Sequence, residues 1–120
     1  MRMASLLLEM SAIAVLLTGS SVDANQLLIH NEINQLLEYI ETSECSFIRN
    51  DNLYPGEKAA DHINKKYKHF LGRIQSVEDF IEYSATKSEL TGNYYYVECP
   101  EDSRVRLKDW LLVELKRIRE

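Results

Sequence analysis

The N-terminal segment constrains this chain most, because it decides in which compartment the rest of the chain folds. It begins with Met1-Arg2-Met3, which carries one positive charge, and continues with an apolar stretch whose uninterrupted part covers residues 10–17. Val22-Asp23-Ala24 then puts small apolar residues at the two positions that a signal peptidase inspects. These features are typical of a secretory signal peptide. We predict a signal peptide over residues 1–24, cleaved after Ala24, and a single small helical domain over residues 25–120.

Glu9 lies inside the apolar stretch and leaves a second interpretation open, a cytosolic amphipathic helix. A membrane anchor is disfavoured, because the apolar run is shorter than the roughly 20 residues that cross a bilayer. No cysteine lies near the cleavage position, which argues against a lipoprotein. We therefore expect export of a small protein with no membrane span after cleavage.

Cys45 and Cys99 are the two cysteines of the chain, and both lie in the predicted mature part. In an oxidising compartment two such cysteines are expected to pair with each other. The bridge would close a segment of about 55 residues, for which the chain-entropy model gives roughly 4 kcal/mol of stabilisation. A metal pair is the alternative, and the absence of a histidine at ligand spacing weakens it. We predict a Cys45–Cys99 disulfide and no metal site.

The charge balance limits the classes of partner. The chain has 14 Lys and Arg residues against 19 Asp and Glu residues, a net charge of −5. A nucleic-acid-binding protein needs a basic face that neutralises phosphates, so we expect no nucleic-acid partner. Glycine-rich phosphate loops, Cys-x-x-Cys pairs and a defensible Ser/His/Asp order are all absent from the sequence. We predict no cofactor.

The spacing of apolar residues predicts a mainly α fold with about four helices, a short two-stranded antiparallel β ribbon and one disulfide. The predicted helices cover residues 26–42, 56–72, 77–86 and 104–118. The predicted strands cover residues 45–50 and 94–99, and residues 51–56 read as a turn. Tyr39 falls on the polar face of the first helix, and Leu71 falls on the inner face of the second.

The predicted disulfide and the two predicted strands constrain one another. If Cys45 faces Cys99 in an antiparallel pair, the same register puts further residues opposite one another. These pairs are Phe47 with Val97 and Arg49 with Tyr95.

The order of motifs resembles a known family. Its elements are Phe47-Ile48-Arg49-Asn50, then Tyr54, Ala59, His62 and Lys66, then the Ser76–Ser88 segment, Thr91-Gly92 before Tyr95 and Val97, and a closing Trp110-Leu111 helix. Together they resemble the YfeK-like family of small secreted bacterial proteins of unknown function, over about residues 27–116. The family usually has glycine where this chain has Asp51, and proline where it has Tyr94. The resemblance implies export and a periplasmic location, and it implies no activity.

Arg49 and Asn50 are polar residues directly after an apolar pair, at the end of the first predicted strand. A guanidinium beside an amide can hold a carboxylate or a phosphate. The structural alternative is that Arg49 stacks on Tyr95 or pairs with a carboxylate, and that Asn50 caps the turn.

His62 is the histidine best placed for function, one residue before an expected core position and four before Lys66. General-base catalysis would need a pocket and an orienting partner. The structural alternative is a hydrogen-bonded residue that packs the second helix against the ribbon.

We therefore predict a non-enzymatic periplasmic binding or protein-interaction module, with an unknown protein or a small anionic ligand as partner and no assigned catalytic residue. Two alternatives stay open: a small periplasmic hydrolase that uses His62, and a purely structural or stress-related protein. The candidate binding residues are Arg49, Asn50, Tyr54, His62, Lys66 and Tyr95.

Overall fold

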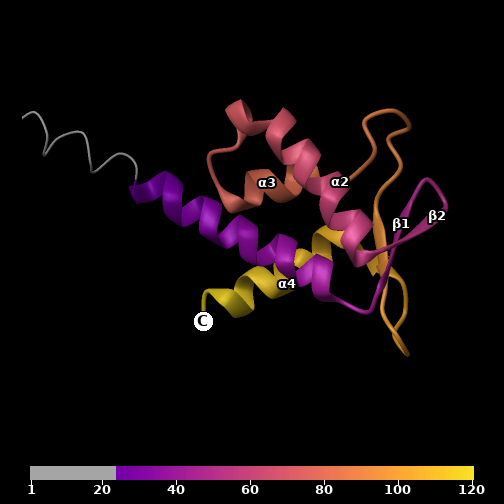
Figure 1. Ribbon diagram of the computed structural model, residues 1–120. Helices are drawn as coiled ribbons and strands as arrows, with labels where there is room; N and C mark the ends of the chain where they lie inside the picture. Colours follow the sequence, from indigo (N-terminus) through magenta and orange to yellow (C-terminus); the bar gives the residue numbers. More distant parts are fainter. Residues whose placement is uncertain (1–23) are drawn as a thin grey trace, which may run out of the picture.

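The computed structural model describes residues 24–120, in which four helices lie on one side of a small sheet (Figure 1). The predicted signal peptide lies outside the described residues, apart from Ala24. The helices are an N-terminal helix over residues 24–42, α2 (Gly56–His69), α3 (Val77–Ser84) and α4 (Leu107–Ile118), with a 3₁₀ turn, η1 (Leu71–Arg73), after α2. The strands are β1 (Ser46–Arg49), β2 (Asn52–Pro55), β3 (Tyr96–Glu98) and β4 (Val105–Arg106).

The sheet has four antiparallel strands in the order β2-β1-β3-β4, so the prediction of a two-stranded ribbon was wrong. The hairpin that was not predicted joins β1 to β2. Its turn consists of Asn50 and Asp51, whose φ angles are 50° and 67°. A two-residue turn with both residues in the left-handed region matches the right-handed twist of a hairpin. Residues 52–55 therefore pair with β1, whereas the sequence pattern suggested only a turn. The last strand, β4, takes two residues from the start of the predicted last helix.

The predicted register of the ribbon is confirmed. β1 and β3 are antiparallel, and Phe47 pairs with Val97. Cys45 and Cys99 form the predicted disulfide beside that pair. The same register carries Arg49 towards Tyr95, which places the polar end of β1 at the opposite end of the strand from the disulfide.

One apolar core joins all four helices to the covered face of the sheet. Side chains from every layer are fully buried in it, among them Ile33, Leu36, Phe80, Val97 and Leu111. Two predicted faces need correction. The second helix ends at His69, and Leu71 in the following 3₁₀ turn is 57% exposed. Tyr39, predicted to be on the polar face, stacks on Trp110 with ring centroids 4.4 Å apart.

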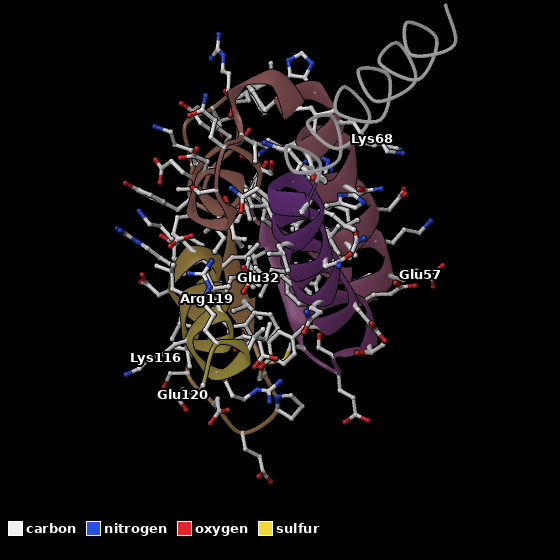
Figure 2. All side chains as sticks on the ribbon, turned by 90° about the vertical axis from the view of Figure 1, so that its left-hand side faces the viewer. Glu32, Glu57, Lys68, Lys116, Arg119 and Glu120 are labelled. Atoms are coloured by element: carbon white, nitrogen blue, oxygen red, sulfur yellow. A yellow bond between two sulfur atoms is a disulfide. The ribbon has the colours of Figure 1, made fainter. Side chains whose placement is uncertain are left out.

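A network of ion pairs joins three of the helices at the C-terminal end of the fold. Arg119, just after α4, donates from Nε to Glu32 at 3.0 Å and from Nη1 to Glu78 at 3.1 Å. Figure 2 shows Arg119 and Glu32 side by side between α4 and the N-terminal helix. We call these three residues the Arg119 triad.

Within residues 24–120, none of the helices combines the length and the apolar character that a membrane crossing requires.

Candidate functional site

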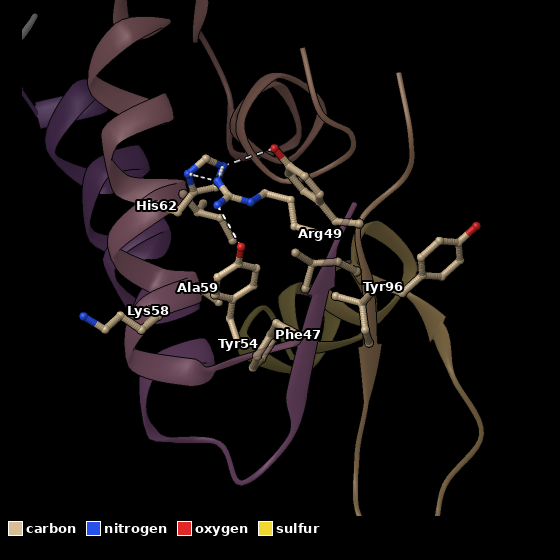
Figure 3. A pocket seen from close by; sticks show the side chains of 11 residues that line it. Phe47, Arg49, Tyr54, Lys58, Ala59, His62 and Tyr96 are labelled. Atoms are coloured by element: carbon tan, nitrogen blue, oxygen red, sulfur yellow. Dashed lines mark hydrogen bonds between the residues drawn. The ribbon is translucent and has the colours of Figure 1, made fainter. Parts of the chain in front are cut away.

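Five of the six candidate binding residues meet at the junction of β1, β2, α2 and the segment before β3. We call Arg49, Tyr54, His62, Lys66 and Tyr95 the polar cluster. Figure 3 shows Arg49 directed from its strand towards His62 on α2, with Tyr54 rising to the same point. The antiparallel register and the spacing of four between His62 and Lys66 on one helix face explain why side chains so distant in sequence converge.

The contact between Arg49 and His62 determines which nitrogen of the imidazole ring carries the proton. Nη1 of Arg49 lies 2.8 Å from Nδ1 of His62 and 3.1 Å from Nε2. A guanidinium only donates, so we assign the shorter contact as a hydrogen bond accepted by Nδ1, which places the ring proton on Nε2. Nε2 in turn lies 3.2 Å from the hydroxyl oxygen of Tyr95, to which it donates.

Burial and the surrounding positive charges keep His62 neutral. Burial is the largest cause, and together with the charges of Arg49, Lys66 and Lys65 it lowers the pKa of His62 from 6.5 to about 4. Asp61 acts in the opposite direction and is the weakest of these influences. The imidazole is therefore uncharged at neutral pH, as the hydrogen bond from Arg49 requires.

Lys66 uses its ammonium group inside the protein. Nζ donates to the carbonyl oxygen of Lys87 at 2.8 Å and to the hydroxyl oxygen of Tyr95 at 3.1 Å, and it lies 3.5 Å from a carboxylate oxygen of Glu89. Only 11% of the Lys66 side chain is exposed. With its three donors engaged, Lys66 ties α2 to the segment before β3 and adds charge to the cluster.

The hydroxyl group of Tyr95 accepts from both His62 and Lys66, which leaves its own proton for a further acceptor. The hydroxyl group of Tyr54 accepts from Nη2 of Arg49 at 3.2 Å and likewise keeps its proton. In residues 24–120 neither proton has an acceptor among the recorded hydrogen bonds. The cluster therefore offers two hydroxyl donors, one bonded to Arg49 and one bonded to His62 and Lys66.

Arg49 has no carboxylate partner among the ion pairs of the described residues. Its recorded polar contacts are the neutral groups of His62 and Tyr54, which use two of the five N–H donors of a guanidinium. The guanidinium carbon lies 4.9 Å from the centre of the Tyr54 ring, so Arg49 stacks on Tyr54 and the predicted stacking on Tyr95 was wrong. Lys66 is the cation that lies over Tyr95, at 4.9 Å.

Asn50 lies beside the polar cluster and holds the neighbouring loop. Its side-chain oxygen accepts from Thr91 at 2.7 Å and from Asn93 at 3.3 Å, and its amide nitrogen lies 3.5 Å from the hydroxyl of Ser88. Asn50 thus attaches the tip of the β1–β2 hairpin to residues 88–93. Its side chain serves this attachment, whereas the sequence suggested a ligand contact or a turn cap.

Two cavities meet at the polar cluster. An open hollow of about 450 Å³ carries most of the polar groups, and an apolar pocket of about 170 Å³ lies next to it. Both are lined by the same four members of the cluster, Arg49, Tyr54, His62 and Tyr95. The hollow additionally has walls that the sequence analysis did not single out as site residues, namely Asn52, Lys65, His69, Phe70, Ser88, Glu89 and Leu90.

The loop around Ser88 could not be assigned to the site from the sequence, because its contacts are with a hairpin about 40 residues earlier. The Thr91-Gly92 motif was the one sequence feature that could have pointed to this loop. Gly92 has a φ of 75°, which glycine adopts without strain, and this conformation turns the loop back towards Asn50.

No group of three His, Cys, Asp or Glu side chains within residues 24–120 is arranged to hold a metal ion. The chemistry that the described arrangement offers is donation of hydrogen bonds from a positively charged, partly buried surface.

Comparison with known proteins places this chain in a family. Residues 28–119 match the family of unknown function DUF5329. The chain belongs to this family. It is also 29% identical over 89 residues to the uncharacterized protein YfeK of Salmonella typhimurium, an alignment that covers 71% of this chain and 72% of YfeK. The predicted resemblance to a YfeK-like family of unknown function is thus confirmed. No solved structure matches the chain.

Proposed function

We propose that this protein is an exported, periplasmic binding protein whose polar cluster captures a small anionic ligand through Arg49. The observation that carries the proposal is the environment of Arg49. Its guanidinium is partly buried, and its recorded partners within residues 24–120 are neutral. Taking a charge out of water is costly unless an opposite charge or strong hydrogen bonds compensate it. A bound carboxylate or phosphate would supply that compensation.

The groups around Arg49 suit an oxyanion. The guanidinium retains three N–H donors, and a planar fork of such donors can bind a carboxylate or phosphate through two parallel hydrogen bonds. The hydroxyl protons of Tyr54, which is bonded to Arg49, and of Tyr95, which is bonded to His62 and Lys66, add two further donors. Lys66 and Lys65 raise the local positive potential. After burial, this potential and the charge of Arg49 are what lower the pKa of His62.

Export is supported by two separate observations. The disulfide is typical of proteins that fold in an oxidising compartment. The N-terminal sequence pattern predicts a signal peptide. A periplasmic location agrees with both.

The geometry favours binding over a hydrolase that uses His62 as a general base. Nδ1 is occupied by the donor from Arg49, and Nε2 carries the proton. A pKa of about 4 also makes the imidazole a weak base at neutral pH. The hollow beside the cluster, in turn, argues against a purely structural protein without a site.

An NMR titration tests the proposal on the purified, disulfide-bonded protein. Sodium acetate and sodium phosphate are added separately, with sodium chloride keeping the ionic strength constant. We expect saturable shifts of the amide signals around Arg49 and His62 with at least one of the two anions. Charge-assisted hydrogen bonds contribute about 1.5–3 kcal/mol, so Arg49→Ala should weaken binding by about 10- to 100-fold.

Arg73→Ala is the matched control, because Arg73 is exposed and lies away from both cavities. It removes the same charge from the protein and should leave the titration unchanged. Shifts that stay linear with concentration, or that Arg49→Ala leaves as they are, would contradict the proposal.

A further inference from the structure

The apolar pocket beside the polar cluster suggests what else the ligand carries. Four apolar side chains from β1, α2 and α4 form its inner wall, namely Phe47, Ala59, Ile63 and Leu107. These side chains are between 2% and 8% exposed, so the wall belongs to the core. Figure 3 shows Phe47 and Ala59 below the contact between Arg49 and His62.

The pocket and the charged group are in contact. Arg49, Tyr54 and His62 line the apolar pocket as well as the open hollow. A head group held by Arg49 therefore lies where the two cavities meet. From that position one part of a ligand can enter the hollow and another can enter the pocket.

The volume of the pocket limits the size of the apolar part. A cavity of about 150 Å³ lined by apolar side chains is large enough to bind benzene. The pocket here has about 170 Å³. It would accept one six-membered ring or an acyl chain of about four to six carbons.

We propose that the ligand is a small amphipathic carboxylate whose carboxylate binds Arg49 and whose ring or short acyl chain fills the pocket lined by Phe47, Ala59, Ile63 and Leu107. The inference rests on the proposed function, since it needs Arg49 to hold the head group. It goes further in naming a carboxylic acid with one small apolar group as the ligand class. An inorganic anion would use the hollow alone and would leave the pocket unfilled.

A series of carboxylates tests this inference on the wild-type, disulfide-bonded protein. Acetate, butanoate, hexanoate, octanoate and benzoate are titrated, and the dissociation constants are measured by NMR or calorimetry. Each buried methylene should tighten binding about fourfold, so hexanoate, with four more methylenes, should bind about 250-fold more tightly than acetate. Octanoate should gain little over hexanoate. Intermolecular NOEs from the benzoate ring to the methyl groups of Ile63 and Leu107 should appear.

Two alanines that are adjacent in sequence provide a matched pair of variants. Ala59 lines the apolar pocket, whereas Ala60, buried to a similar degree, faces a different cavity. Ala59→Leu should lower the affinity for hexanoate towards that for acetate and leave acetate binding as it was. Ala60→Leu should change neither affinity. The NOEs and the chain-length series use the wild type, so they decide the question even if Ala59→Leu fails to fold.

The outcomes separate the inference from the proposed function. Equal affinities for acetate and hexanoate, both lost in Arg49→Ala, would overturn the pocket and leave the anion site standing. Affinity that keeps rising through octanoate would overturn the stated size limit. Absence of saturable binding for every anion, or binding that does not depend on Arg49, would overturn both.

Discussion

Arg49 and Arg119 both join elements that are distant in sequence, but their electrostatic surroundings differ. Arg119 follows the C-terminal end of α4 and reaches the N-terminal helix and the first turn of α3, whereas Arg49 lies at the end of β1 and reaches α2. Arg119 meets the carboxylates of Glu32 and Glu78, whose hydrogen bonds raise its pKa. Arg49 meets the imidazole of His62 and the hydroxyl of Tyr54.

The difference teaches how to tell a structural arginine from a binding arginine. The charge of Arg119 is compensated within the fold, so a ligand would have to displace an existing partner. The charge of Arg49 is compensated by no carboxylate in the described part of the chain, and two hydroxyl donors and a hollow lie beside it. Removal of Arg119 should therefore lower stability, whereas removal of Arg49 should weaken anion binding.

Removal of the disulfide should lower the free energy of unfolding without removing either arginine. It therefore shows how large a purely structural effect can be. Cys45 and Cys99 are 54 residues apart in sequence. Replacing both by alanine releases a loop of that size in the unfolded chain, which should lower the free energy of unfolding by about 4 kcal/mol. Urea denaturation of the double variant and of the oxidised wild type measures the loss. A change below about 1 kcal/mol would show that the link adds little.

The two regions should lose stability in different pH ranges. The pKa of His62 is lowered to about 4 in the folded state, from 6.5. As the pH falls from about 6.5 to about 4, the unfolded chain therefore takes up a proton that the folded chain does not, and stability falls. Glu78 has a pKa lowered below 4.5, chiefly by the hydrogen bond from Arg119. The contribution of Glu78 to stability is fully present above about pH 4.5 and is lost as the pH falls below that value.

Variants of the two arginines should each weaken the pH dependence in one of these ranges. Arg49→Ala should raise the pKa of His62 part of the way towards 6.5, because burial and the two lysines still lower it. NMR of the imidazole ring measures this pKa, and the stability profile above about pH 4.5 should become less steep. Arg119→Ala should flatten the profile only below that pH. Identical profiles for the two variants would mean that the two regions do not titrate separately.

At neutral pH the two arginines should differ in their contribution to folding. Arg119 makes two partly exposed ion pairs, for which measured values suggest about 1 kcal/mol in total. Arg119→Ala should lower the free energy of unfolding by about that amount. Arg49→Ala removes a cation that has no carboxylate partner among residues 24–120 and should change stability by less than about 0.5 kcal/mol. Urea denaturation compares them, and an equal or larger loss for Arg49→Ala would mark Arg49 as structural.

The smallest expected effect concerns the turn that presents Arg49. Asp51 has a φ of 67°, a conformation that glycine adopts without strain. Asp51→Gly should therefore stabilise the hairpin by about 0.5 kcal/mol and leave anion binding unchanged. Asp51→Ala is the control, since it removes the same carboxylate but keeps a Cβ atom and should give no gain. Destabilisation by Asp51→Gly would show that the aspartate side chain supports the turn.

The proximity of the residues in the polar cluster, though not their individual contacts, could be predicted from the sequence because two constraints acted together. The disulfide set the register of β1 against β3, and helical spacing put His62 and Lys66 on one face of α2. The β1–β2 hairpin did not follow, because Asn50-Asp51 lacks the glycine that marks such a turn most clearly. The role of Asn50 did not follow either, since its partners lie in a loop about 40 residues later and no local pattern encodes that contact.

Thermal unfolding in the presence of a carboxylate tests the central claim, that Arg49 provides an anion-binding site and Arg119 does not. The melting temperatures of the wild type, Arg49→Ala and Arg119→Ala are measured in increasing sodium hexanoate, against sodium chloride at equal ionic strength. A ligand that binds only the folded state raises the melting temperature, and above its dissociation constant the rise grows with the logarithm of its concentration. We predict a rise for the wild type and for Arg119→Ala, even though the latter starts lower, and no rise for Arg49→Ala. An equal rise in all three proteins would contradict the account.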